Sequence, residues 1–498
     1  MAITPGGSLN SVAASQKQTL TTNYIDFTAD TTGGWAQQYL PDLMEKEAEV
    51  FGPRTISGFL SQVGAEEAMS SDQVIWSEQS RLHISLKGTV ATAGSTNGTF
   101  EVTSDIDGNN ASSASVFTLA DHGVRVNDMV LIASAGIVTK CKVVDADTAV
   151  IQVEPYDKAD LTGHATTAGG STLLVIGSHF AKGQSYFSNA DGSTSTDQRG
   201  ANEPTFKSFT NRPIIMKDYY EISGSDTARI GWVEVTAEDG ASGYLWYLKA
   251  EAETRLRFTD YMEMALLEAE QTADNSVIGN FHTDTDLGPG AGTQGLFDAI
   301  STRGNVTSGV SGVNAATDLA EFDAILAEFD NQGAIEENMM FVNRATSLAI
   351  DDMLASMNSY GAGGTSYGVF DNSEDMALNL GFSGFRRGSY DFYKSDFRYL
   401  NDKATRGGIN DAATTAAIRG VIVPAGTSTV YDQMLGKNLK RPFLHVRFRA
   451  SQTDNRRFKT WVTGSVGAAT SALDAMQIHM LTERCLVTQG ANNFMLMQ

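Results

Sequence analysis

The sequence has few of the residues that metal-binding and disulfide-bonded proteins require. Only two cysteines, Cys141 and Cys485, occur in 498 residues, and they lie too far apart to form a disulfide framework. The seven histidines never occur at metal-ligand spacing. Residues 1–15 lack the charged and apolar regions of a signal peptide. We therefore expect no metal, no cofactor, and folding in a reducing cytoplasm.

Long apolar runs and basic residues are also scarce. Gly, Ser, Asp or Lys interrupts every apolar run before it reaches the roughly 18 residues needed to cross a bilayer, so no membrane role is expected. Lys and Arg number 36 against 59 Asp and Glu, which gives a net charge of -23. This balance argues against a protein that reads nucleic-acid sequence and leaves DNA as a non-specific neighbour.

Catalytic motifs are equally sparse. The glycines of Gly290–Gly295 match the dinucleotide-binding pattern, but a polar segment that contains proline precedes them where a buried strand is required. The Asp284–Gly288 stretch starts like a calcium loop, yet its glycine comes one position early. No serine elbow or phosphate loop occurs. We interpret both stretches as loops and expect no enzyme.

The apolar content, 41% of the residues, is sufficient to bury more than one core in a chain of this length. Residues 1–34 have too few apolar side chains to order themselves and are predicted to form an arm. A helix is expected over 41–50, between Pro41 and the Gly52-Pro53 pair. Leu82, Ile84 and Leu86 alternate with polar residues, which predicts a strand that forms one limb of a long hairpin.

A segment rich in Thr, Val, Ala and Gly interrupts this hairpin at residues 88–179 and predicts an inserted all-β domain. Strands are expected at 99–103, 129–133, 140–144, 149–153 and 172–176. The hairpin resumes with strands at 206–210 and 214–222. The expected core of the insertion is Val130, Ile132, Val143, Val150, Ile151, Val153, Leu174 and Ile176.

The clearest helix spans residues 243–272, which no Gly or Pro interrupts after Gly243. Its expected buried stripe is Leu245, Leu248, Ala252, Leu256, Met262, Leu266 and Ala269. A helix at 319–329, a strand at 339–342 and a helix at 346–357 follow. Further strands are expected at 420–423, 443–448, 458–466 and 476–481, so the fold class is α+β.

One cluster of basic residues stands out against the acidic background. It contains Lys437, Lys440, Arg441, Arg447, Arg449, Arg456, Arg457 and Lys459, with Asp454 as the only acid between 437 and 459. The cluster is a candidate contact for a neighbouring subunit or for DNA phosphates. Pairing within the chain, or a solvated sheet face, explains it equally well.

This order of elements resembles the major capsid protein of tailed bacteriophages, the Hong Kong 97 fold. Two stretches sharpen the resemblance: Met339-Met-Phe-Val-Asn-Arg-Ala-Thr346 is similar to the turn from strand to helix in many such subunits, and Leu481–Gly490 resembles their closing segment. Some members of this family with large heads, including gut and marine groups, carry an insertion in the extended loop, the long hairpin of the fold, to which residues 88–179 would correspond.

The resemblance implies a division of the chain into seven parts. These are an N-terminal arm (1–34), a first helix and first limb of the extended loop (35–87), the inserted domain (88–179), the second limb (180–228), a peripheral domain with the spine helix (229–300), an axial domain (301–435) and a C-terminal peripheral sheet (436–498).

The resemblance also implies a function and a set of partners. The subunit would self-assemble into hexamers and pentamers of an icosahedral head around double-stranded DNA, in a virion built in the host cytoplasm. Portal, scaffold and decoration proteins would be its other partners. The alternatives are another structural virion protein, such as a tail tube or decoration protein, and a soluble hydrolase with a fused β-rich binding domain.

Overall fold

The fold is described from a computed structural model of the chain. The described residues are 58–60, 65–78, 81–90, 98–107, 122–134, 136–146, 150–158, 160–167, 169–184, 207–225, 235–236, 242–243, 245–271, 292–333, 335–358, 383–412, 417–425, 427–432, 437–466 and 469–498. The arm expected over 1–34 and the helix expected over 41–50 lie outside them.

The chain divides into two compact units, one formed by residues 1–76 and 210–498 and the other by residues 77–209. The first unit is therefore built from two segments, whereas the second is continuous in sequence. The chain passes from one to the other along β2 (Val74–Glu78) and returns along β9 (Lys207–Asn211), and these two strands pair. The strand expected at 206–210 is thus present.

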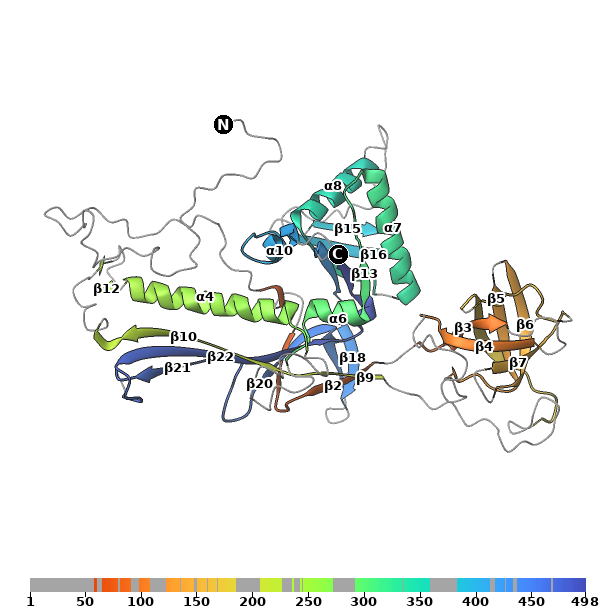
Figure 1. Ribbon diagram of the computed structural model, residues 1–498, viewed down its shortest axis with the longest axis horizontal. Helices are drawn as coiled ribbons and strands as arrows, with labels where there is room; N and C mark the ends of the chain where they lie inside the picture. Colours follow the sequence, from red (N-terminus) through yellow and green to blue (C-terminus); the bar gives the residue numbers. More distant parts are fainter. Residues whose placement is uncertain are drawn as a thin grey trace. The chain divides into compact units, whose positions relative to one another are not determined.

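Six antiparallel strands of the second unit form a closed barrel in the order β3-β4-β7-β6-β5-β8 (Figure 1). They are β3 (Ser85–Val90), β4 (Gly98–Asp105), β5 (Asp128–Ser134), β6 (Ile137–Asp145), β7 (Val150–Pro155) and β8 (Ser171–Ser178). All five strands expected between 99 and 176 occur. The barrel starts at Ser85, before the expected Gly88, because β3 pairs with both β4 and β8 and so removes their free edges.

Five expected residues, Val130, Ile132, Val143, Ile151 and Val153, are buried in the barrel core. Val150 is only partly buried, and the phase expected for β8 is wrong. Leu173 is fully buried, whereas Leu174 and Ile176 are 36% and 46% exposed. Residues 173–176 are all apolar, so an alternating pattern cannot decide which of them faces inward. Leu82, expected on a buried strand face, is 83% exposed and lies outside any strand. The other buried apolar residues are Leu86, Val90, Phe100, Val102, Val124, Val130, Ile132, Cys141, Val143, Ala146, Ile151, Val153 and Leu161.

A buried histidine links three segments of the barrel. His164 is 5% exposed; its Nδ1 lies 2.9 Å from Ser134 Oγ and its Nε2 2.8 Å from Thr139 Oγ1. Lys158 Nζ donates to the same Thr139 hydroxyl at 3.1 Å. Burial and the nearby Lys158 charge both lower the pKa of His164, so the folded barrel favours the neutral ring.

We expect the barrel to lose stability as the pH falls below about 6.5, the usual histidine pKa. The unfolded chain binds a proton there and the folded barrel resists it, so the contribution of His164 is complete above this pH and declines below it. Hydrogen exchange of barrel peptides, corrected for intrinsic rates, should show faster opening at pH 5.5 than at pH 7.5. His164→Gln should flatten this dependence; an unchanged profile would assign it to other groups.

The first unit contains an extended sheet in the order β1-β20-β22-β10, with β21 paired to β22 (Figure 1). The strands are β1 (Ala65–Met69), β20 (Leu444–Arg449), β22 (Ala475–Thr488), β10 (Ile214–Ser223) and β21 (Lys459–Gly464). β10 and β22 run antiparallel over ten residue pairs, and β1 joins β20 in parallel. The strands expected near 214–222, 443–448, 458–466 and 476–481 are confirmed, with β22 longer than predicted.

The long helix α4 (Leu245–Glu268) packs against β10 and β22 (Figure 1). The helix was predicted, and Met262 and Leu266 of its expected stripe are buried, but Ala252 and Leu256 of that stripe are not. Leu256 is 43% exposed and Ala252 is exposed, whereas Phe258 is fully buried. Ala250, Thr254, Phe258, Met262 and Leu266 form the buried line at spacing i, i+4. The side chains of Leu245 and Leu248 lie outside the described part.

A buried asparagine joins the end of α4 to the sheet. Asn211 Nδ2 donates to Leu486 O at 2.6 Å and to Gln294 O at 3.1 Å. Asn211 Oδ1 accepts from Gln294 N at 2.8 Å and from Gln271 Nε2 at 2.9 Å. The end of the glycine-rich loop, interpreted from sequence as a loop, is thus fixed by hydrogen bonds before α6 (Leu296–Arg303) begins.

A six-stranded mixed sheet carries the helices α7 (Ala315–Gln332) and α8 (Arg344–Asn358). Its order is β13-β23-β17-β14-β16-β15, with β13 (Asn305–Thr307), β14 (Glu337–Val342), β15 (Ser383–Arg387), β16 (Tyr390–Asp396), β17 (Gly420–Pro424) and β23 (Met495–Met497). Asn343 Oδ1 accepts from Thr346 N at 2.8 Å and so caps α8. The strand, Asn-x-x-Thr turn and helix predicted around Met339–Thr346 are therefore present.

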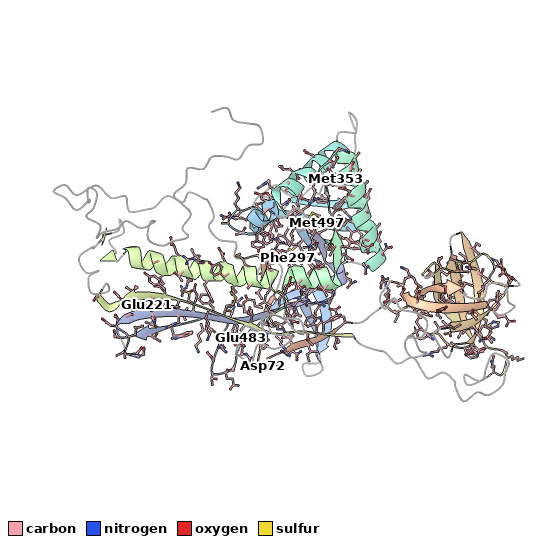
Figure 2. The ribbon with its side chains drawn as sticks, viewed as in Figure 1. Asp72, Glu221, Phe297, Met353, Glu483 and Met497 are labelled. Carbon is pink, nitrogen blue, oxygen red and sulfur yellow. The ribbon has the colours of Figure 1, made fainter. Side chains whose placement is uncertain are left out.

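The C-terminal residues belong to this mixed sheet and not only to the extended one. β23 pairs with β13 and β17, and Met497 packs in one core with Met353 of α8 (Figure 2). Residues 495–497 thus lie among elements that the sequence placed in 301–435. The remaining elements are β11 (Val235–Thr236), β12 (Ser242–Gly243), η2 (Arg398–Leu400), α10 (Arg406–Ala412), β18 (Thr427–Asp432), β19 (Lys437–Pro442) and η3 (Ala491–Asn493).

Candidate functional site

Among the described residues of the first unit, arginines and carboxylates form a network of ion pairs on the extended sheet. The acids come from β1, the turn after it and β22, and the arginines from β20, β22 and the segment before β21. Arg447 lies 2.8 Å from Glu67, Arg484 lies 2.8 Å from Glu66, and Arg449 pairs with Asp72. Ion pairs therefore reinforce the parallel pairing of β1 with β20.

Glu483 of β22 (Figure 2) pairs with two arginines of this network. Its carboxylate lies 2.7 Å from Arg449 and 2.7 Å from Arg456, and the residue is only 3% exposed. Removing a charge from water is costly unless opposite charges and hydrogen bonds compensate it. Two guanidinium groups supply this compensation, so the network ties the turn after β20 to the central strand.

Arg484, the next residue, faces the helix side of the sheet and is 7% exposed. Its guanidinium donates to Glu66 Oε1 at 2.8 Å and to Arg457 O at 3.0 and 3.2 Å. Burial lowers the pKa of Arg484, and the nearby Glu66 carboxylate opposes that effect. Glu66 also pairs with Arg457, so one carboxylate joins two arginines.

The structure places every described side chain of the predicted basic cluster in an intrachain ion pair. Arg447, Arg449, Arg456 and Arg457 pair as above, and Lys459 lies 2.8 Å from Asp454. The side chains of Lys437, Lys440 and Arg441 lie outside the described part. Pairing within the chain, one of the two explanations left open by the sequence, accounts for the described members. Contact with a subunit or DNA stays a prediction.

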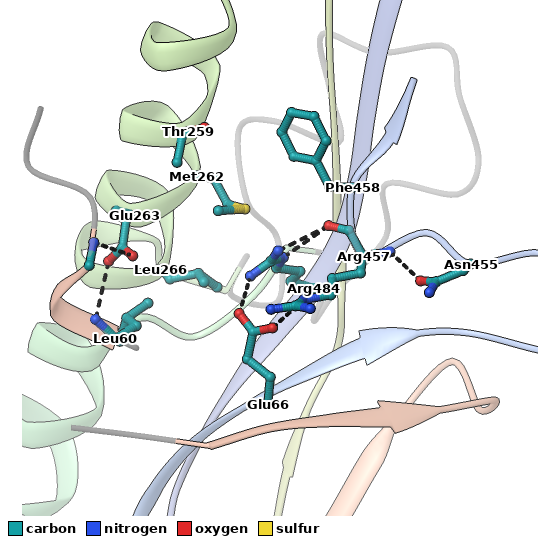
Figure 3. A pocket seen from close by; sticks show the side chains of 11 residues that line it. Leu60, Glu66, Thr259, Met262, Glu263, Leu266, Asn455, Arg457, Phe458 and Arg484 are labelled. Atoms are coloured by element: carbon teal, nitrogen blue, oxygen red, sulfur yellow. Dashed lines mark hydrogen bonds and ion pairs between the residues drawn. The ribbon is translucent and has the colours of Figure 1, made fainter. Parts of the chain in front are cut away.

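A hollow of about 570 Å³ opens beside this network, between α4 and the sheet (Figure 3). Its walls include Thr259 and Met262 of α4, together with Phe458 and Arg457. Glu263 of α4 lies at its edge, where its carboxylate accepts hydrogen bonds from Gly58 N at 3.2 Å and Leu60 N at 3.4 Å. The hollow therefore combines apolar and ionic walls.

A hydrolase would need two carboxylates beside one hollow. Acid–base catalysis would also require that their oxygens can reach a substrate, so the partners of these oxygens matter. Burial raises the pKa of Glu263, which is the environment of a general acid. Both its oxygens, however, accept backbone N–H groups, and both oxygens of Glu66 face arginines. Both acids line the hollow, and all four of their oxygens accept from backbone N–H groups or pair with arginines of the same chain.

The described residues also bear on metal binding and on membrane insertion. No group of three or more His, Cys, Asp or Glu side chains in those ranges is arranged to hold a metal ion. None of the helices described is both long and apolar enough to cross a membrane.

The sequence identified Arg447, Arg449, Arg456 and Arg457 of this site, but neither Arg484 nor the acidic partners of these arginines. Glu66, Glu67 and Asp72 lie more than 350 residues before the cluster, and nothing in their local sequence marks them. The parallel pairing of β1 with β20 brings the two regions together. Glu263 was missed because it sits in a stripe that the sequence read as apolar.

No family model and no curated protein matches this sequence. Among solved structures, the chain is similar to one from Microbacterium phage Oxtober96, at 9% identity and a TM-score of 0.37, over 92% of this chain and 95% of that one. It is similar to the capsid structure of the cyanophage P-SCSP1u, at 8% identity and a TM-score of 0.31, over 64% and 79%.

A virus-like particle from Pyrococcus furiosus is a third similar structure, at 8% identity and a TM-score of 0.27, over 59% of this chain and 79% of that one. Overlap at this level does not define a shared fold. The function is therefore argued from the residues and elements of this chain.

Proposed function

We propose that this protein is a structural virion protein, the major capsid protein of a tailed bacteriophage, which self-assembles into the hexamers and pentamers of an icosahedral head around double-stranded DNA. Portal, scaffold and decoration proteins would be its other partners in the virion. The proposal assigns the subunit no catalytic step.

The observation that carries the proposal is the combination of elements in the first unit. A 24-residue helix lies on long antiparallel strands, and the same unit holds a mixed sheet with two helices and the C-terminal strand. This combination supports the resemblance to the capsid fold that the sequence suggested. Ion pairs between segments that are distant in sequence join the strands of the extended sheet. Such cross-links suit a subunit that must keep its shape within a shell.

The partners of the buried charged side chains also support a structural role. Buried carboxylates and arginines neutralise one another, and the acids beside the hollow bond to backbone or guanidinium groups. An enzyme would instead hold at least one such group ready for a substrate. This favours the capsid proposal over the hydrolase alternative.

Electron microscopy of the purified protein tests the proposal directly. We expect closed shells of uniform size with six-fold and five-fold capsomers, formed with or without added DNA. Tubes of stacked rings would assign the protein to a tail, and binding only to preformed heads would make it a decoration protein. Persistent monomers under all assembly conditions would contradict a capsid function.

The barrel gives a second prediction, because it is continuous in sequence and its ends leave through paired strands. Replacing residues 79–206 with a short Gly/Ser linker should leave β2 and β9 able to pair, and the rest of the subunit folded and able to form capsomers. Size-exclusion chromatography and microscopy provide the readout. Aggregation of the deletion variant would mean that the barrel is integral to the subunit.

A further inference from the structure

The barrel carries a cleft of about 420 Å³ on its surface. The residues that line it come from β5, β6 and β8, which are neighbours in the barrel with β7, and from the positions directly after β7 and β8. Pockets that bind small molecules measure roughly 300–1,000 Å³. This barrel cleft therefore has room for a ligand of one or two rings.

Apolar side chains form much of the wall of the barrel cleft. Ile176 is 46% exposed and Tyr156 is 48% exposed, and Met129 of β5 lines the cleft with them. A register shift between Met129 and Val130 leaves Ile176 without a pairing partner on β5. Bulges of this kind turn a side chain in a new direction and are frequent beside binding sites. The bulge thus adds an apolar side chain to a concave, solvent-accessible surface.

Two aromatic rings hold one wall of the cleft in place. The Tyr156 hydroxyl lies 2.8 Å from His179 Nδ1, and the two rings stack at 23° with 5.8 Å between their centroids. Tyr156 follows β7 and His179 follows β8, and β6 and β5 lie between these strands in the barrel order. The contact therefore joins strands that do not pair with each other. A wall that is fixed before binding lowers the entropic cost of binding.

Two hydrogen-bond donors on the lining are unused. Within the described part of the chain, the Lys140 ammonium group has no ion pair and the Ser178 hydroxyl has no hydrogen bond. No acid is among the described residues that line the cleft. Burial raises the pKa of Cys141 to about 12, so this lining thiol stays neutral. The cleft thus presents a positive charge and a hydroxyl without a counter-charge.

We propose that the barrel cleft binds a small molecule that combines an apolar ring with a carboxylate. The ring lies against Met129, Tyr156 and Ile176. The carboxylate accepts hydrogen bonds from Lys140 and Ser178, and the bond from the ammonium group is charge-assisted. Every residue involved belongs to the barrel, so the proposal does not rest on the proposed capsid function.

Methyl NMR of the full-length protein tests this proposal with two matched probes. The methionine methyl groups carry a carbon-13 label, and Met129→Leu assigns the Met129 signal. Indoleacetate and indoleacetamide share a ring and a shape, but only indoleacetate is an anion. We expect both probes to shift the Met129 signal saturably. The dissociation constant of indoleacetate should be about fivefold lower, the upper range for one exposed ion pair.

Three variants separate charge from apolar contact. Lys140→Met should abolish the preference for indoleacetate and leave the affinity for indoleacetamide nearly unchanged. Lys142→Met is the matched control, because Lys142 lies two residues along β6 on the same face but is not among the residues that line the cleft. It should keep the preference. Ile176→Ser should weaken both probes about fivefold, because it removes part of the apolar wall.

The other outcomes each contradict the proposal. A Met129 signal that neither probe shifts would exclude a binding site in the cleft. Equal dissociation constants for the two probes, or the same loss of preference in Lys142→Met as in Lys140→Met, would exclude recognition of a carboxylate there. A Met129 signal that moves with protein concentration in the absence of a probe would assign the cleft to a contact between copies of the chain instead.

Discussion

Phe258→Ala is expected to destabilise the first unit by about 3–5 kcal/mol, the usual cost of removing a fully buried aromatic side chain. Phe258 has no exposed surface and packs edge-on against Phe458, with 5.6 Å between ring centroids. The variant therefore loses an edge-on aromatic contact between the middle of α4 and the segment that enters β21. Urea denaturation, with hydrogen exchange on α4 peptides to identify the transition, measures the loss.

Leu256→Ala is the matched control on the same helix, two residues away. Because Leu256 is 43% exposed, its truncation should cost less than about 1 kcal/mol and leave the unit folded. The pair distinguishes the observed helix face from the one predicted by sequence. Equal losses for the two variants, or a larger loss for Leu256→Ala, would show that α4 is rotated from the described orientation.

Arg484→Met should cost about 3–5 kcal/mol, as expected when one partner of a buried ion pair is removed. Arg484 is 7% exposed and bonds both Glu66 and the carbonyl of Arg457. The substitution leaves Glu66 with Arg457 alone and the carbonyl without its guanidinium donors. Urea denaturation of the variant, compared with the unchanged protein, measures the change in the free energy of unfolding of the first unit.

Arg386→Met provides the control for this second experiment. Its side chain is 53% exposed and lies 3.5 Å from Asp391, so the change should stay within about 0.5 kcal/mol. Adding Glu66→Gln to Arg484→Met should recover part of the loss, because the carboxylate no longer lacks its buried partner. A loss in Arg484→Met no larger than that in Arg386→Met would mean that water already solvates the network.

The long helix α4 shows which features the local sequence could predict and which it could not. The absence of Pro and Gly after Gly243 predicted α4 nearly to its ends. The predicted stripe was correct at Met262 and Leu266 but wrong at Ala252 and Leu256, because the helix carries two lines of apolar residues, one through Leu256 and one through Phe258. Helical periodicity weighs both equally, and only the position of β10 and β22 decides which one is buried.

In the candidate site, too, the sequence revealed some features and only the tertiary structure revealed the others. The basic residues between 437 and 459 were visible as a cluster, and pairing within the chain was one of the explanations that the sequence left open. Their partners could not be found, because Glu66 and Glu67 become neighbours only when β1 pairs with β20. Glu263 was hidden for a related reason, since its ligands are backbone groups of residues 58 and 60.

By itself the sequence determined what depends on neighbouring residues: the five barrel strands between 99 and 176, the helices α4, α7 and α8, and the Asn343 cap. The spacing of apolar residues and the capping of a helix depend on interactions between residues only a few positions apart. Tertiary structure decided the phase of β8, the buried face of α4 in its first half, the return of β23 to the mixed sheet and the partners of Arg447, Arg449, Arg456, Arg457 and Arg484. Those outcomes depend on contacts between residues up to several hundred positions apart, and such contacts leave no periodic pattern in either partner.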